Sequence, residues 1–203
     1  MNIFVVGATG RTGRQVVEQA LARGHGVTAM IRRPGAFDPH EKLRSLIGNP
    51  TISNDLRQGL EGCDAVISCL GQRSKEDATL LHDSAAAMLA AMRGHAAKPY
   101  LVVSQGLLFP SRSPIIAVLR FLLRRYIADS AAMERLVQAS DVDWVIVRPP
   151  RLADGGLTRG YRIKVSARPG GSAVMQRADL SSFLVDEVEK REHLRAIVGV
   201  TSA

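Results

Sequence analysis

Blocks of apolar residues alternate with helical patterns along most of the chain. Short apolar runs with the length and composition of buried strands lie at 2–7, 26–31, 64–70, 100–104 and 143–148. Between them, apolar residues recur at helical spacing, which predicts helices near 11–23, 78–97 and 115–139. Strands that alternate with helices predict an α/β fold: a doubly wound, mostly parallel sheet with helices on both faces.

The remaining segments carry weaker signals. A further strand is predicted near 50–53. The last part of the chain predicts short extended pieces near 161–165 and 172–175, a helix from about 178 to 190, and a strand at 195–200. No repeat, linker or low-complexity tract interrupts the pattern, so we expect one domain over residues 1–203.

The first apolar run leads directly into three glycines spaced G-x-x-G-x-x-G, and a helical pattern begins at once. Gly7 allows the chain to turn sharply off the strand, Gly10 allows the backbone to approach a pyrophosphate, and Gly13 allows the helix to pack near the strand. The helix N-terminus adds unpaired N–H groups and a partial positive charge. Strand, glycine turn and helix together predict a dinucleotide-binding site of Rossmann type. The same segment contributes Thr9, Arg11 and Thr12.

The second strand, 26–31, ends in Arg32 and Arg33 rather than in an acidic residue. Sites for NAD usually carry Asp or Glu at this point to bind the ribose 2′-hydroxyl, whereas arginine suits the 2′-phosphate of NADP. We therefore expect NADP(H) as the cofactor, with NAD(H) as the alternative. One of the two arginines is enough to contact the phosphate, and a solvent-exposed basic turn is the other interpretation.

Ligands of such sheets bind beyond the carboxyl ends of the strands. At these ends the sequence offers further cofactor-binding candidates, namely Asp55, Leu56, Leu70, Gly71, Arg73 and Pro149. Asp55 would accept a hydrogen bond from the adenine amino group, or serve as a turn-forming residue. Leu70 and Gly71 form a strand end along which a cofactor fits. Arg73 would pair with phosphate or substrate, or stay in an exposed loop.

The charge balance and the cysteine content exclude other classes of protein. The formal net charge is +8, from 27 basic and 19 acidic residues, but the basic residues are spread along the chain and aromatic residues make up only 4%. Nucleic-acid sites usually concentrate basic charge and stacking aromatics, so we expect no nucleic-acid partner. Cys63, Cys69 and the five histidines lack metal-ligand spacing, which predicts reduced thiols, no metal site and a cytoplasmic location. We see no leader sequence and no apolar run of the ~18 residues that span a membrane.

Four motifs distributed over the chain resemble those of one family. They are G-A-T-G-x-T-G at 7–13, G-x-D-A-V-I at 62–67, V-V-S at 102–104 and V-R-P-P at 147–150. They resemble the atypical short-chain dehydrogenase/reductases of the NmrA-like, NAD(P)H-binding type, and within these the flavin reductase and biliverdin reductase B group. The resemblance implies an NADPH-dependent reductase that passes hydride to a flavin, a quinone-like molecule or a related conjugated acceptor. Residues from about 150 to 203 would form the substrate side.

Two departures from the family pattern bear on catalysis. Typical short-chain dehydrogenases protonate a carbonyl with a Tyr-x-x-x-Lys pair, but Tyr126 is followed four residues on by Ser130. A tyrosine without a nearby cation keeps a pKa near ~10 and is a poor acid at neutral pH, so alcohol and ketone chemistry is not expected. Where the flavin and biliverdin reductases carry a histidine after the two prolines, this chain has Arg151.

The resemblance assigns the catalytic roles to Ser104 and Arg151. Ser104 aligns with the serine that those reductases place beside nicotinamide and substrate, and it would donate a hydrogen bond to the acceptor. Arg151 would stabilise the developing anion or bind a carboxylate or phosphate, but it cannot shuttle a proton. The proton would come from solvent.

Two other functions fit the same sequence. One is a regulatory protein of NmrA type that senses NADP(H) and controls a partner without turnover, and the other is an isomerase or epimerase with a tightly held cofactor. The apolar stretch 115–126 exceeds the needs of one helix face. It predicts a substrate lid, a packed helix, a contact with a second subunit or, least favoured, contact with a membrane surface. We expect a monomer or a homodimer.

Overall fold

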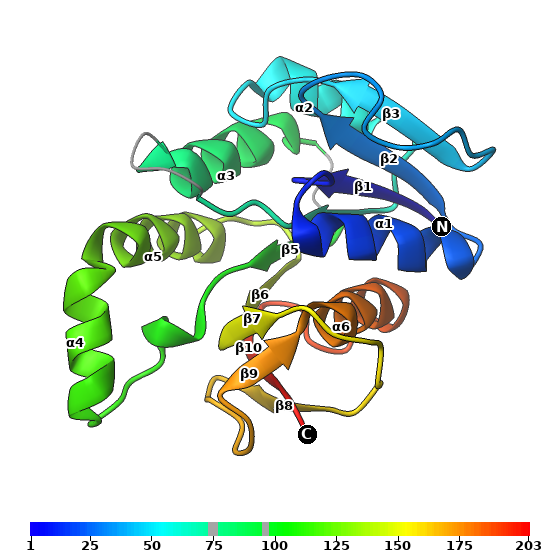
Figure 1. The fold of residues 1–203 in the computed structure, drawn as a ribbon. Coiled ribbons are helices and arrows are strands. Elements are labelled where there is room, and N and C mark those ends of the chain that lie inside the picture. The colour runs from blue at the N-terminus through cyan, green and yellow to red at the C-terminus, as the bar shows by residue number, and fades with distance from the viewer. Residues whose placement is uncertain (73–76, 95–97) are drawn as a thin grey trace.

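The computed structural model describes residues 1–72, 77–94 and 98–203 and contains one large sheet (Figure 1). Its eight strands are Asn2–Val6 (β1), Gly26–Ile31 (β2), Leu43–Ile47 (β3), Ala65–Ser68 (β4), Tyr100–Val103 (β5), Trp144–Arg148 (β6), Tyr161–Val165 (β8) and Ala196–Ser202 (β10). They follow the order β3-β2-β1-β4-β5-β6-β10-β8. β8 pairs antiparallel with β10, and the other neighbours are parallel. Arg151–Ala153 (β7) and Val174–Gln176 (β9) form a separate parallel pair.

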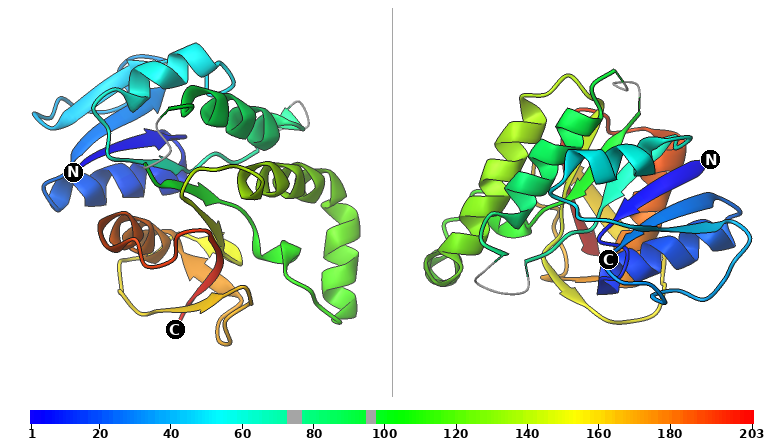
Figure 2. Two further views of the ribbon diagram at one scale, coloured as in Figure 1. Left: turned by 180° about the vertical axis from the view of Figure 1, so that it is seen from behind. Right: turned by 90° about the horizontal axis from the view of Figure 1, so that it is seen from above.

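Helices cover both faces of the sheet (Figure 2). Arg11–Ala22 (α1) and Arg177–Lys190 (α6) pack together on one face. The other face is covered by Ser53–Leu60 (α2), Leu80–Ala91 (α3) and Arg124–Gln138 (α5). A short 3₁₀ helix, Gly106–Leu108 (η2), follows β5, and Pro114–Leu122 (α4) extends away from the sheet (Figures 1 and 2). This architecture confirms the predicted doubly wound, Rossmann-type fold.

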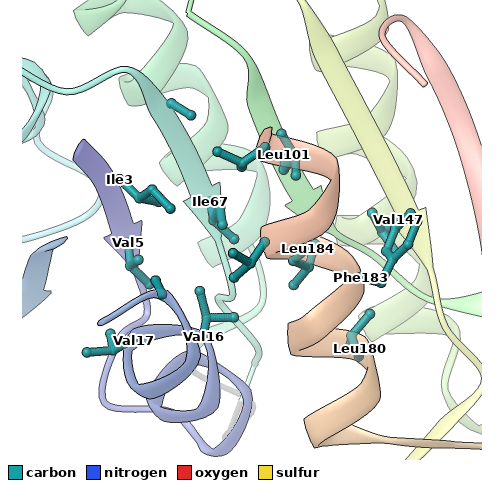
Figure 3. Close-up of a cluster of buried hydrophobic side chains, with 14 of the residues drawn as sticks. Ile3, Val5, Val16, Val17, Ile67, Leu101, Val147, Leu180, Phe183 and Leu184 are labelled. Atoms are coloured by element: carbon teal, nitrogen blue, oxygen red, sulfur yellow. The ribbon is translucent and has the colours of Figure 1, made fainter. Parts of the chain in front are cut away.

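Alternation along β1 divides the core into two layers. Ile3 and Val5 belong to a buried cluster with α1 and α6 (Figure 3). Phe4 and Val6 belong to the opposite cluster, with α2, α3 and α5. α2 approaches β1 so closely that a Cβ on Gly59 would lie 2.1 Å from the Phe4 ring. Both layers are therefore anchored on the strand that leads into the glycine turn.

Most predicted elements are confirmed, with three differences. The strand predicted near 50–53 is wrong, because β3 lies earlier and α2 begins at Ser53. β3 is an edge strand with no fully buried side chain, so its sequence lacks the apolar signal of an interior strand. The single helix predicted over 115–139 is divided at Leu123 into α4 and α5. β7, with three residues, is too short to give a sequence signal.

Candidate functional site

A cavity of about 660 Å³ lies over the carboxyl ends of the strands, where the strand order reverses between β1 and β4. Parallel sheets of this type bind ligands at that point. The cavity brings together most of the predicted cofactor-binding residues: Gly7, Thr9, Gly10, Arg11, Thr12, Arg32, Leu70 and Gly71. These eight residues thus line one cavity, although they come from three separate segments of the chain.

The glycine turn has the geometry that a phosphate-binding turn requires. Gly7 has a φ of +75°, and a Cβ there would lie 2.9 Å from backbone atoms of Cys69. A Cβ on Gly13 would lie 2.2 Å from the carbonyl oxygen of Gly7, so glycine is needed for α1 to begin this close to β1. Gly10 is the N-cap of α1, and its N–H donates a 2.9 Å hydrogen bond to the Gly7 carbonyl. The first turn of α1 has no acidic residue, so no carboxylate within it competes with an anion.

Arg177 and Asp154 add charges that the sequence analysis did not identify. Arg177 lines the cavity with a side chain that is 11% exposed. Asp154 accepts hydrogen bonds from Arg177 (2.6 Å) and from Arg11 (3.2 Å), and so joins the first residues of α6 and α1. Arg177 directly follows β9, for which the sequence predicts an extended piece near 172–175, but nothing in the sequence places the end of that piece beside the glycine turn.

At the end of β2, Arg32 lines the cavity, whereas Arg33 is exposed and lies outside its lining. The adjacent wall is formed by residues 48–50, which follow β3. The sequence analysis missed these three residues because it placed β3 too late in the chain. The structure thus brings one of the two predicted arginines, not both, to the cofactor cavity.

Asp55 and Leu56 do not lie where the sequence predicted. Both belong to α2, and neither is among the described residues that line the cavity. Asp55 accepts a 2.8 Å hydrogen bond from the backbone N–H of Asn49, which is the turn-forming alternative. Leu56 is fully buried in the core under α2 and α3. The physical reason is the same shift of β3, since Asn49 rather than Asp55 follows the strand end.

Leu70 and Gly71 line the cavity at the end of β4, as predicted, while Arg73 lies outside the described residues. Gln72, in the same wall, donates a side-chain hydrogen bond to Asp129 of α5. Asp129 also accepts hydrogen bonds of 3.0 and 2.9 Å from two backbone N–H groups in the first turn of α3. This buried carboxylate therefore fixes both the N-terminus of α3 and the cavity wall.

The α5 positions that a Tyr-x-x-x-Lys pair would occupy serve internal contacts. The hydroxyl of Ser130 donates a 3.1 Å hydrogen bond to the carbonyl of Tyr126 and accepts a 2.7 Å hydrogen bond from the side-chain amide of Gln105. These contacts tie α5 to the loop after β5. They leave no ammonium group beside Tyr126 at the position of the family lysine.

A second cavity, of about 630 Å³, has a lining that shares β7 with the lining of the first. Arg151 and Leu152 are consecutive in β7, and Arg151 lines the second cavity while Leu152 lines the first. Pro149, predicted to bind the cofactor, lines the second cavity instead. The lining is largely apolar, and its charged members are Arg148, Arg151 and Arg168. Within the described part of the chain, no acidic residue belongs to this lining.

One side of α4 forms part of this cavity and the other side is exposed. Ile116 and Leu119 line the cavity, whereas Ile115 and Phe121 are 71% and 66% exposed. Arg120 holds the helix in place with hydrogen bonds to backbone carbonyls at the end of η2, one of them 3.0 Å long. α4 therefore contributes to the roof of the second cavity.

Ser104 and Arg148 lie side by side, because Val103 of β5 pairs with Val147 of β6. Both side chains reach Glu134 of α5, whose side chain is 3% exposed. The Ser104 hydroxyl donates to Glu134 at 2.5 Å, and Arg148 donates from Nε at 2.9 Å and from Nη2 at 2.5 Å. The hydroxyl proton of Ser104 is already donated, so this geometry does not provide the predicted hydrogen bond from Ser104 to an acceptor.

Comparison with known proteins supplies the family. Residues 7–191 match a family of NAD(P)H-binding proteins, and the match begins at the first glycine of the turn. The chain belongs to this NAD(P)H-binding family. This membership confirms the resemblance that its motifs predict, and it establishes a nicotinamide cofactor without distinguishing NADP from NAD.

Several known proteins are similar in sequence to part or most of the chain. It is 37% identical over 82 residues to the photosystem II assembly factor Ycf39 of Synechocystis sp. and 31% identical over 121 residues to divinyl chlorophyllide a 8-vinyl-reductase of Arabidopsis thaliana. These matches cover 39% and 51% of this chain, but only 25% and 29% of those proteins. The uncharacterized protein YwnB of Bacillus subtilis is 23% identical over 206 residues, which cover 95% of this chain and 94% of YwnB.

Solved structures show the same fold over the whole length. The oxidoreductase ylbE of Lactococcus lactis has a TM-score of 0.86 at 17% identity and covers 100% of this chain and 91% of its own. SP1627, a proposed NADH-flavin reductase of Streptococcus pneumoniae TIGR4, has a TM-score of 0.83 at 23% identity and covers both chains completely. At such identities the likeness establishes the fold alone. Among the described residues, no helix combines the length and the apolar character needed to cross a membrane.

Proposed function

We propose that this protein is an NADPH-dependent oxidoreductase that passes hydride to a flavin, a quinone-like molecule or a related conjugated acceptor. The observation that carries the proposal is the presence of two cavities that are both lined by β7. The first contains the glycine turn of a dinucleotide site, and the second is largely apolar and positively charged. β7 borders both, because Arg151 lines the second cavity and Leu152 lines the first. Such a pair suits a dinucleotide beside a planar apolar partner.

The residues of the first cavity fit NADPH. Gly7, Gly10 and the first N–H groups of α1 would hold the pyrophosphate, because the turn leads into a helix N-terminus with no acidic residue in its first turn. Arg32 would contact the 2′-phosphate. NADH is the alternative cofactor, and relative affinities for the two dinucleotides distinguish them.

The chemistry divides between the cofactor and the chain. When bound, the reduced nicotinamide supplies a hydride, and the acceptor takes up this hydride and a proton from solvent, so that NADPH is oxidised and the acceptor reduced by two electrons. The chain binds both molecules in these two cavities and limits the access of water through the apolar lining of the second. Arg148, Arg151 and Arg168 make that lining electropositive, which favours an acceptor that becomes anionic. The fold likeness to SP1627 supports a flavin among the acceptors.

The test is NADPH oxidation by the purified protein, followed through the nicotinamide absorbance, with riboflavin, FMN or menadione as acceptor. NADPH binding is measured in parallel by nicotinamide fluorescence. Turnover above the rate without protein supports the proposal. Binding of NADPH without turnover of any acceptor refutes it.

A regulatory protein that senses NADP(H) is the second candidate. The observation that favours it is the structural use of Tyr126 and Ser130, which leaves α5 without the acid–base pair of typical short-chain dehydrogenases. A sensor would bind NADPH tightly, turn over no acceptor and bind a protein partner in a cofactor-dependent way. An isomerase or epimerase, the third candidate, would retain its cofactor through purification.

Location and assembly complete the proposal. Cys63 and Cys69 have free thiols, which suits the reducing cytoplasm. The protein would act there as a monomer or homodimer on a small-molecule acceptor, without a nucleic-acid partner. Size-exclusion chromatography with light scattering measures the assembly state.

A further inference from the structure

Two arginines of the second cavity are held in different ways. Arg148 is anchored, because its Nε and Nη2 donate to Glu134 and its guanidinium carbon lies 4.8 Å from the centre of the Phe109 ring. Its side chain is only 12% exposed. Arg151 is exposed, and its side chain has no hydrogen-bond or ion-pair partner among the residues that the structure describes. One cation is fixed in place, and the other must be ordered when a ligand binds.

Arg148 donates two hydrogen bonds to the Glu134 carboxylate, and the rest of its guanidinium is available to bind a ligand. Two of its three nitrogens donate to the carboxylate, and Nη1 has no partner within the described ranges. Since Arg148 lines the second cavity, a ligand there meets a donor whose direction is already set. Phe109, 4% exposed, packs against the same guanidinium and further restricts its rotation.

We infer that Arg148, rather than Arg151, is the cation that contacts the acceptor, and that Glu134 is the residue that positions it. This inference rests on the proposed function and names the group that stabilises the negative charge formed when hydride reaches the acceptor. A preorganised donor does so without reorganising during the reaction. An exposed arginine first loses the conformational freedom of its long side chain.

Stability alone does not account for the buried ion pair. Taking an arginine and a glutamate out of water is costly, and apolar residues of similar volume usually stabilise a fold equally well or better. The pair also interrupts an otherwise buried apolar environment at the end of β6. The Ser104 hydroxyl adds a third hydrogen bond to the Glu134 carboxylate and so fixes the orientation of the paired hydrogen bonds from Arg148. Orientation of Arg148 toward the cavity is what this arrangement provides.

The experiment compares the variants Arg148→Lys, Arg148→Gln, Glu134→Gln and Arg151→Gln under NADPH turnover with riboflavin and with menadione. Arg148→Gln is expected to lower kcat roughly 100-fold, as for loss of one preorganised donor to a developing anion. Arg148→Lys keeps the positive charge but loses the paired hydrogen bonds to Glu134, so its kcat should remain well below that of the wild type. The kcat of Glu134→Gln should lie between those of Arg148→Lys and the wild type. Arg151→Gln should lower kcat much less than Arg148→Gln does, because the exposed Arg151 guanidinium adds charge to the lining but is not preorganised. NADPH affinity and KM for NADPH should stay unchanged throughout.

Two controls distinguish a role of the ion pair in orienting Arg148 from a role in stabilising the fold. The double variant Glu134→Leu/Arg148→Met replaces the ion pair by apolar residues, and it should keep the fold while losing turnover. In Arg148→Ala, added guanidinium below unfolding concentrations should restore part of the activity, which a structural role would not allow. Wild-type rates in Arg148→Gln, or a larger loss in Arg151→Gln, overturn the inference.

The inference about Arg148 and the proposed function can be tested independently of each other. If none of the acceptors supports NADPH oxidation by the wild-type protein, the reductase proposal fails. The inference is then tested by acceptor binding, measured as quenching of riboflavin fluorescence. A weaker affinity for riboflavin in Arg148→Gln than in Arg151→Gln supports the contact. Equal affinities of wild type and Arg148→Gln overturn it.

Discussion

Arg23, the residue after α1, donates a 2.5 Å hydrogen bond to Asp186 of α6. The same guanidinium donates to the hydroxyl of Ser182 at 2.9 Å. The other Asp186 oxygen accepts a 2.6 Å hydrogen bond from the hydroxyl of Tyr161 in β8. Asp186 thus links the two helices on one face of the sheet to its antiparallel edge strand. The contact joins the segment of the glycine turn to the C-terminal part that supplies Arg177.

We predict that Asp186 makes stability depend on pH in the acid range. Burial alone would raise the pKa of Asp186, but hydrogen bonds from Tyr161 and Arg23 and the charge of Arg23 together lower it. A carboxyl with a lowered folded-state pKa stabilises the fold above its unfolded pKa of about 3.9, and this stabilisation is lost as the pH falls through the folded-state pKa. Asp186→Asn should therefore cost about 1.5–3 kcal/mol at neutral pH and much less at about pH 3.

Chemical denaturation at the two pH values measures this difference. Asp141→Asn is the matched control, because Asp141 is exposed and its carboxylate has no hydrogen-bond partner among the described residues. An equal cost of Asp186→Asn at both pH values would contradict the prediction.

Gly13→Ala should abolish dinucleotide binding and destabilise the protein. The added Cβ would lie 2.2 Å from the Gly7 carbonyl oxygen, so α1 must move away from β1. Overpacking of this kind costs about 1–3 kcal/mol. Gly156→Ala is the control, because a Cβ there meets nothing within 4 Å. Both variants are checked by NADPH fluorescence titration and by chemical denaturation. Unchanged NADPH binding in Gly13→Ala would mean that the glycine turn is not part of the cofactor site.

Arg32→Gln should lower the affinity for NADPH roughly 10- to 100-fold, which corresponds to loss of one hydrogen bond to a charged group. The affinity for NADH, which lacks the 2′-phosphate, should stay nearly constant. Arg33→Gln is the matched control, since Arg33 is exposed outside the cavity lining. Binding titrations with both dinucleotides measure the ratio. If the neighbouring variant changes the ratio instead, Arg33 is the phosphate contact.

The two thiols should respond differently to the cofactor. Burial raises the pKa of Cys69 to about 12, and it also raises the pKa of Cys63, so both should react slowly with iodoacetamide at neutral pH. Cys69 lines the cofactor cavity, whereas Cys63 lies in the core under α2. NADPH should therefore protect Cys69 alone, measured by mass spectrometry of labelled peptides. Equal protection of both cysteines would mean that the cofactor acts through global stability.

The sequence predicts the interior of this fold better than its edges. β1, β2, β4, β5 and β6 are buried on both faces, so their apolar runs stand out. β3 and β7 carry no such signal, because β3 is an exposed edge strand and β7 has three residues. Because the predicted β3 lay too late in the chain, Asp55 and Leu56 were expected just after a strand end, whereas both belong to α2.

The candidate site shows the same limit in its chemistry. The glycine turn is predictable because local geometry dictates its residues. Glu134 is not, because it lies in the middle of α5 and reaches Ser104 and Arg148 only through the packing of α5 on the sheet. The one sequence signal is Arg148 itself, a charge that ends an otherwise apolar strand. Arg177 likewise becomes a cavity residue only through tertiary structure.

The Glu134–Arg148 ion pair also bears on the alignment of β5 with β6. Side chains alternate between the two faces along a strand, and Val103 is paired with Val147. A slip of one residue would turn Arg148 toward the layer of α1 and α6 and leave Glu134 buried without its cation, at about 3–5 kcal/mol. The ion pair therefore disfavours the one-residue slip, which β5 and β6, with apolar side chains on both faces, would otherwise tolerate more easily.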